Sequence, residues 1–129
     1  MKRVLVIDDV KEFTFPADCD VQYARTLEDG FAQLERIFKL PLIEAPVEFE
    51  LWLDHDLGGE DTIRPLCLSL AEMAYYDNTY PLTRIVICSL NPVGIKWMES
   101  TLSPYYPVTI CDNPQKLGFL LGNSVAKWY

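Results

Sequence analysis

The stretch that most constrains this chain spans residues 49–59 and reads FELWLDHDLGG. Its first part is rich in large apolar side chains and predicts a buried strand. The strand ends abruptly in Asp54, His55 and Asp56, and the pair Gly58-Gly59 then predicts a turn. Carboxylates this close together repel one another unless a cation or a shared proton lies between them. The cluster is therefore either a site for a metal or for phosphate chemistry, or it is spread into water.

Length and charge limit the possible functions. The chain has 129 residues, half of them apolar, which fits one domain with one core over residues 1–129. Its 19 acidic and 11 basic residues give a net charge of −8, and no run of Lys or Arg offers a patch for a polyanion. We therefore expect no duplex DNA as a partner. A small phosphate ligand is compatible with this charge, because a divalent cation held by carboxylates would supply positive charge.

The cysteines and the N-terminal segment bear on location. The four cysteines lie far apart and match neither a zinc-binding nor a redox spacing, so reduced thiols in a cytosolic protein are the simplest interpretation. The apolar run at residues 3–7 is too short for the core of a signal peptide. No apolar run approaches the length that spans a membrane. We expect a cytoplasmic location, cellular or host, and no membrane partner.

Strand and helix patterns alternate along the chain. Strands are predicted at residues 3–7, about 21–24, 49–53, 84–88 and 108–111. Helices are predicted to follow the cap residues Thr26, Asn91 and Asn113, and another to begin near Pro65. The first helix is expected to place Leu27, Phe31, Leu34 and Phe38 on one face. This alternation predicts an α/β fold, with a five-stranded, mostly parallel sheet and helices on its faces.

The connection between the first two strands is unusual. Residues 10–20 contain Pro16 and show no helical period, so they predict a loop where a parallel sheet normally has a crossover helix. A shortened or missing first helix leaves part of one sheet face bare. We expect the loop at residues 13–15, the C-terminal aromatics Trp128 and Tyr129, or a second subunit to cover that face.

Polar side chains follow the carboxyl ends of the predicted strands, where open α/β sheets build their sites. These residues are Asp8, Asp9, Asp54, His55, Asp56, Ser89, Asn91 and Asp112. Two of these residues, Asn91 and His55, also have a structural explanation. A role as the cap of the following helix explains Asn91 as well as a functional role does. Neighbouring side chains in a strand point to opposite faces, so His55 points away from Asp54 unless the chain turns there. If it points away, its role would be to orient other groups.

The acidic pair, the third-strand Asp54 and the later Ser89 resemble the receiver domain of two-component response regulators. In that family the acidic residues hold magnesium, the strand-end Asp accepts a phosphoryl group, and a hydroxyl and a fifth-strand Lys contact the phosphate. Here the fifth predicted strand ends in Asp112, and Lys116 falls inside the next helix. Without that cation, a phosphoacceptor role for Asp54 is disfavoured.

A narrower resemblance covers essentially the whole chain. IDD at residues 7–9, LDHDLG at 53–58 and SxNPVG at 89–94 resemble the cyclic-phosphate processing receiver-like family. This resemblance implies a receiver-like, flavodoxin-like domain with strand order 2-1-3-4-5. It also implies processing of cyclic phosphates such as cyclic nucleotides or RNA ends. Two departures are Cys88, where the family usually has His, and Val10-Lys11, which replaces Glu-Arg.

The resemblance suggests roles for the strand-end residues. Asp8, Asp9 and Asp54 would bind Mg²⁺ or Mn²⁺, whose preferred ligands are carboxylate oxygens. His55 would be the general acid or base, with Asp54 and Asp56 also catalytic, and Ser89 and Asn91 would donate to the phosphate. The alternative is a catalytically silent receiver-like module that binds a protein partner or forms a homodimer. The missing Lys and the presence of Cys88 favour this alternative.

Overall fold

The computed structural model describes residues 2–39 and 48–121. The strands in this part of the chain are Lys2–Ile7 (β1), Cys19–Ala24 (β2), Glu48–Leu53 (β3), Arg84–Cys88 (β4) and Val108–Cys111 (β5). The helices are Leu27–Lys39 (α1), Arg64–Tyr75 (α2), Pro92–Leu102 (α3) and Pro114–Leu121 (α4). No helix among these residues is both long enough and apolar enough to cross a membrane.

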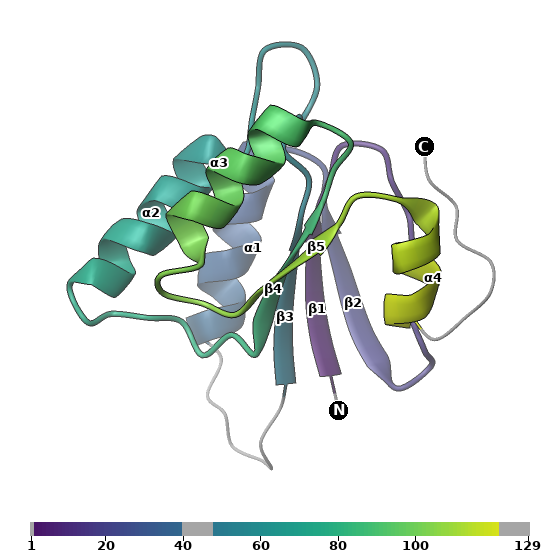
Figure 1. The fold of residues 1–129 in the computed structure, drawn as a ribbon. Coiled ribbons are helices and arrows are strands. Elements are labelled where there is room, and N and C mark those ends of the chain that lie inside the picture. The colour runs from purple at the N-terminus through teal and green to yellow at the C-terminus, as the bar shows by residue number, and fades with distance from the viewer. Residues whose placement is uncertain (1, 40–47, 122–129) are drawn as a thin grey trace.

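The strands form one parallel sheet with the order β2-β1-β3-β4-β5, which confirms the predicted receiver-like fold (Figure 1). The chain moves outward from β1 to β2 and then returns past β1 to β3. The strand order therefore reverses between β1 and β3, and ligands of open α/β sheets bind at such a reversal. In this pair Ile7 is the register partner of Leu53, so the residues that follow them emerge side by side.

Different elements cover the two faces of the sheet. Helices α1, α2 and α3 pack on one face, and α4 packs on the other (Figure 1). No helix lies between β1 and β2, as predicted, although the two strands are parallel. The Phe13 and Phe15 rings instead lie 5.4 and 5.0 Å from that of Trp52, so the loop covers the α4 face as expected. Trp128 and Tyr129, the other aromatics considered for this role, lie outside the described residues.

Side-chain caps begin three of the helices described by the structure, as predicted. Thr26 Oγ1 accepts the Asp29 N–H at 3.1 Å, Asn91 Oδ1 accepts the Gly94 N–H at 3.1 Å, and Asn113 Oδ1 accepts the Lys116 N–H at 2.9 Å. Each bond satisfies an amide that the first turn of a helix leaves unpaired. Helix α2 has no side-chain cap at Ile63 but carries the expected proline in its first turn.

One prediction about α1 was wrong. Phe31, expected on the buried face, is 37% exposed. A Cβ on Gly30 would lie 2.9 Å from Ile7 Cδ1, so the helix packs tightly against β1 at Gly30. The inward stripe therefore includes Gly30 and Leu34 and places Phe31 at its edge. The side chain of Phe38, the other residue in question, lies outside the described part of the structure.

Candidate functional site

Two acidic strand ends meet at the reversal in strand order. Asp8 and Asp54 follow the register partners Ile7 and Leu53, and the Asp54 N–H donates to the Ile7 carbonyl at 3.0 Å. Ligand oxygens from Asp8, Asp9 and Asp54 all lie within 4.8 Å of one another. The structure thus brings together the three carboxylates that the sequence analysis assigned to a metal.

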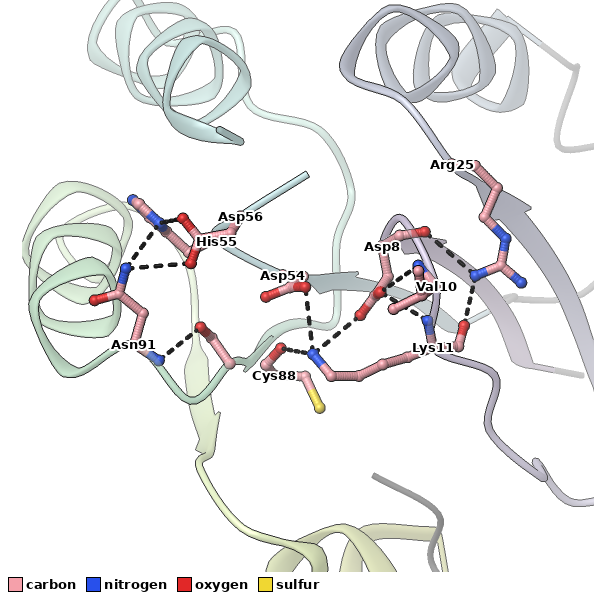
Figure 2. A network of polar contacts seen from close by, with 10 residues as sticks. Asp8, Val10, Lys11, Arg25, Asp54, His55, Asp56, Cys88 and Asn91 are labelled. Atoms are coloured by element: carbon pink, nitrogen blue, oxygen red, sulfur yellow. Dashed lines mark hydrogen bonds and ion pairs between the residues drawn. The ribbon is translucent and has the colours of Figure 1, made fainter. Parts of the chain in front are cut away.

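A tight turn follows Asp8. Its Oδ1 accepts the N–H groups of Val10 at 3.1 Å and Lys11 at 2.9 Å. On the outer side, Arg25 Nη1 donates to the carbonyls of Asp8 at 3.3 Å and Lys11 at 2.6 Å. These bonds fix the backbone of residues 8–11, so the Lys11 side chain points back over the strand ends (Figure 2).

Lys11 is the functional candidate that the sequence analysis missed. Its Nζ lies 3.3 Å from Asp8 Oδ2, 3.3 Å from Asp54 Oδ2 and 3.3 Å from the Cys88 carbonyl oxygen. Although charged, the residue is only 4% exposed. The inference that the site lacks a cation beside Asp54 was therefore wrong, because the loop after β1 supplies one in place of β5.

The sequence carried one signal for Lys11. It is the single basic residue directly behind the acidic pair, at a position where the resembled family usually has Arg. Lys116, the basic residue nearest the end of β5, instead pairs with Asp112 at 2.8 Å, and both side chains are exposed. Asp112 is therefore separate from the acidic cluster. It does not line the pocket described below.

Burial and charge set the protonation of the cluster. Burial raises the pKa of Asp54 to about 6, and the charges of Asp8 and Asp9 act in the same direction against the attraction of Lys11. For Lys11, burial lowers the pKa, but the carboxylates of Asp54 and Asp8 outweigh it and leave the pKa above its ordinary value. The ammonium thus stays charged, whereas Asp54 takes up a proton more readily than an exposed aspartate.

The cluster fits a divalent metal ion. Three carboxylates and one ammonium leave a net charge of −2 when all are ionised, which one divalent cation would neutralise. Carboxylate oxygens are the ligands that Mg²⁺ and Mn²⁺ prefer. Because Lys11 Nζ contacts one oxygen each of Asp8 and Asp54, an ion would share those carboxylates with the ammonium.

His55 lies in a second group of contacts, turned away from Asp54 (Figure 2). The residue is 4% exposed, and its Nδ1 lies 3.0 Å from Asp56 Oδ1. Its Nε2 accepts the Nε–H of Arg64 at 3.0 Å. Because an arginine Nε can only donate, this network assigns the hydrogen of a neutral His55 to Nδ1, which donates to Asp56.

Residues of the SxNPVG motif hold the His55 ring and its partner Asp56 in place. Asn91 caps α3 through Oδ1 and donates from Nδ2 to Asp56 Oδ2 at 3.2 Å. The His55 ring packs against the α3 backbone at Gly94, where an added Cβ would lie 2.4 Å from His55 Cγ. Only glycine leaves room for the ring there. The motif therefore fixes the position of His55 as well as the start of α3.

A pocket of about 330 Å³ connects the two groups. Its lining residues are Lys11, Asp54, Asp56, Ser89, Leu90 and Asn91. The Ser89 side chain is buried, and its Oγ accepts the Asn91 N–H at 3.1 Å, which leaves the hydroxyl hydrogen available to a ligand. Hydrogen bonds from Asn91 and His55 outweigh the effect of burial and lower the pKa of Asp56. Asp56 therefore lines the pocket as a carboxylate.

The thiol at position 88 does not take part in this pocket. The Cys88 side chain is buried in the core layer beneath α4, next to its register partner Cys111 and with Trp52 in the same cluster. Its hydrogen bond with Cys111 and its burial raise the pKa of the Cys88 thiol. Only the Cys88 carbonyl faces the site, where it accepts from Lys11. All four cysteines of the chain are free.

The family model for the cyclic-phosphate processing receiver domain matches residues 3–104. Comparison with curated proteins and with solved structures gives no match. The matched residues run from β1 through α3 and include every residue of the acidic cluster and of the pocket. The chain therefore belongs to the cyclic-phosphate processing receiver domain family.

Proposed function

We propose that this protein binds a cyclic phosphate ester at the carboxyl end of its sheet and opens the ring by hydrolysis. The observation that carries the proposal is the Lys11 ammonium, placed 3.3 Å from both Asp8 and Asp54 beside the buried hydroxyl of Ser89. A phosphate needs positive charge and hydrogen-bond donors, and this pocket offers both inside an acidic protein. The family is also named for cyclic-phosphate processing.

The acidic cluster would hold the metal. Asp8, Asp9 and Asp54 offer the ligand oxygens for Mg²⁺ or Mn²⁺. When bound, such an ion supplies Lewis-acid polarisation of a phosphoryl oxygen. Lys11 would neutralise a second phosphoryl oxygen, which would replace one of its present contacts with Asp8, Asp54 and the Cys88 carbonyl. Ser89 would donate its hydroxyl hydrogen to the phosphate. Asn91 already uses its amide for the α3 cap and for Asp56, which supports a positioning role for it.

Ring opening also requires proton transfer. Attack by water forms one P–O bond and breaks one ester P–O bond, so water must lose a proton and the leaving oxygen must gain one. Asp56 lines the pocket outside the Lys11 contacts, and we assign it the proton from water. The leaving oxygen takes its proton from solvent water, and Asp56 later returns its proton to solvent. Both ring nitrogens of His55 are engaged, which supports an orienting role in which Nδ1–H holds Asp56.

A turnover assay tests the proposal. The pure protein is incubated with Mn²⁺ and a panel of cyclic nucleotides and RNA oligomers that end in a cyclic phosphate, alongside Asp54→Ala, Asp56→Asn and His55→Ala. We expect the wild type to form linear phosphate monoesters and the first two variants to lose at least about 100-fold in rate. Lys116→Gln, a charge change outside the pocket, should retain activity.

Two results would contradict the proposal. Turnover that survives both Asp54→Ala and Asp56→Asn would place the chemistry elsewhere. Failure to turn over any substrate would favour the binding module, in which the acidic strand ends serve folding or ion binding and the helices contact a protein partner.

A phosphoacceptor switch at Asp54 is a second candidate. Lys11 supplies, beside Asp54, the cation that such chemistry requires and that β5 lacks. If Asp54 accepts phosphoryl groups, the protein should bind beryllofluoride in the presence of Mg²⁺, and Asp54→Asn should not. Fluorine NMR would detect the adduct, and absence of binding in the wild type would exclude this function.

A further inference from the structure

Arg64 is a positioned arginine that the mechanism above does not use. It is the first residue of α2 and lies on the far side of His55 from Asp56 and Asn91. Its Nε donates to His55 Nε2 at 3.0 Å, and its Cζ lies 4.6 Å from the centroid of the Trp97 ring. One edge and one face of the guanidinium are thus fixed.

The terminal nitrogens of Arg64 are not used within the described part of the chain. Arg3, Arg25 and Arg84 each pair with an acidic side chain. Within residues 2–39 and 48–121, Nη1 and Nη2 of Arg64 have no hydrogen-bond or ion-pair partner. Arg64 therefore presents a rigidly held pair of donors, the geometry that binds the two oxygens of a phosphate or carboxylate.

The stability of α2 does not explain this placement. A positive charge at the first residue of a helix opposes the helix dipole. The first turn of α2 contains no acidic residue that would offset the unfavourable charge, and Ile63 provides no side-chain cap. An arginine that weakens its own helix, yet is held by a buried histidine and a tryptophan, points to a ligand.

We propose that Arg64 binds a second anionic group of the ligand whose cyclic phosphate lies at Lys11 and Ser89. The position of the first phosphate rests on the proposed function. His55 joins the two places, because its Nδ1 side contacts the pocket residues Asp56 and Asn91 and its Nε2 side holds Arg64. The ligand class is a nucleotide chain that carries at least one phosphodiester next to its cyclic phosphate.

His55 is a positioning residue in this arrangement. A protonated imidazole has two N–H donors and could not accept from Arg64, so the contact requires the neutral ring. Replacing His55 with Phe keeps a ring of similar shape but removes the acceptor for the Arg64 Nε–H. This variant should loosen Arg64 and weaken recognition of the second anion, while Lys11 and Ser89 still hold the first phosphate.

A pair of ligands tests the inference by calorimetry. One is a nucleoside 2′,3′-cyclic phosphate, and the other is a dinucleotide that ends in the same cyclic phosphate. We expect the wild type to bind the dinucleotide about tenfold more tightly. Arg64→Gln and Arg64→Lys should abolish this preference without changing the affinity for the mononucleotide, and His55→Phe should reduce the preference. Arg36→Gln, an exposed arginine of α1 that contacts Gln22, is the control and should behave as the wild type.

Several outcomes would overturn the inference. These are equal affinity of the wild type for both ligands, a dinucleotide preference that survives both Arg64 variants, and absence of binding by either ligand. Circular dichroism identifies a variant that fails to fold. If one Arg64 variant fails to fold, the dinucleotide preference of the other Arg64 variant decides the test. An Arg64-dependent preference without turnover would leave the inference standing and contradict hydrolysis. Efficient turnover of both ligands, unchanged in Arg64→Gln, would support hydrolysis and contradict the inference about Arg64.

Discussion

Lys11 Nζ lies 3.3 Å from Asp54 Oδ2, so the loop after β1 supplies the cation beside the carboxylate at the end of β3. The same nitrogen contacts Asp8 Oδ2 and the Cys88 carbonyl, which joins the ends of β1, β3 and β4. A single buried ammonium thus compensates two carboxylates, and the proposed function assigns it a phosphate oxygen as well.

Replacing Lys11 with Met should destabilise the protein and make its stability depend on divalent cations. The substitution leaves the Asp8 and Asp54 carboxylates close together and uncompensated, and losing one partner of a buried ion pair costs about 3 kcal/mol or more. Urea unfolding with and without MgCl₂ measures both effects.

Lys116→Met is the matched control for Lys11→Met. It removes an exposed pair with Asp112, so its effect on the free energy of unfolding should stay below about 1 kcal/mol. Equal stabilities of Lys11→Met and Lys116→Met, with the same response to Mg²⁺, would show that Lys11 does not compensate the acidic cluster.

Without divalent metal, the stability contribution of Asp54 should fall as the pH rises. Its pKa is about 6 in the folded protein, above the ordinary 3.8, so the folded state holds this proton more tightly than the unfolded chain does. The contribution is complete below about pH 4 and is lost as the pH rises through 6. Asp54→Asn lacks this loss, so its stability relative to the wild type should rise by up to about 3 kcal/mol between pH 4 and 7.

Urea unfolding over this pH range, in the presence of a chelator, measures the difference between Asp54→Asn and the wild type. Carboxylates remote from Asp54 titrate alike in both proteins and cancel in that difference. A constant difference would mean that the Asp54 pKa is not raised in the folded protein.

Divalent cations should bind the folded protein and raise its melting temperature, because a ligand of the native state stabilises it. Asp9→Asn is the cleanest variant for this test. Asp9 contributes a ligand oxygen to the cluster, whereas Asp8 also fixes the turn through Val10 and Lys11. We expect the shift produced by Mg²⁺ or Mn²⁺ to shrink in Asp9→Asn. Asp18→Asn, an exposed change away from the cluster, should retain the full shift.

Gly94→Ala should displace His55. The new Cβ would meet His55 Cγ at 2.4 Å, a distance that requires the ring or α3 to move. Overpacking of this kind costs about 1–3 kcal/mol. Chemical denaturation and the imidazole nitrogen signals in NMR would report the loss of stability and of the Arg64 contact. Val93→Ala changes a neighbouring residue that is 72% exposed and should leave both unchanged. An unperturbed imidazole spectrum in Gly94→Ala would contradict the packing described here.

The fold could be predicted because its signals are local. Apolar runs marked the strands, and the caps at Thr26, Asn91 and Asn113 marked helix starts correctly. Parallel strands place their carboxyl ends at one edge, so the approach of Asp8 to Asp54 followed from the topology.

The direction of individual side chains could not be predicted in the same way. The position of Lys11 depends on a turn fixed by the Asp8 carboxylate and by Arg25, and neither bond has a sequence pattern of its own. The alternation of side chains along a strand already suggested that His55 points away from Asp54. The contact of His55 with Arg64, however, depends on where α2 begins. These features depend on tertiary contacts between segments that are distant in the sequence.

The most direct test of the account is a crystal structure of the protein grown with Mn²⁺ and sulfate. We predict an anomalous manganese peak bonded to oxygens of Asp8, Asp9 and Asp54, with the sulfate in contact with Lys11 Nζ and Ser89 Oγ. Manganese and sulfate that bind elsewhere, with neither bound at these residues, would contradict the claim that the ends of β1, β3 and β4 form one site for a cation and a phosphate.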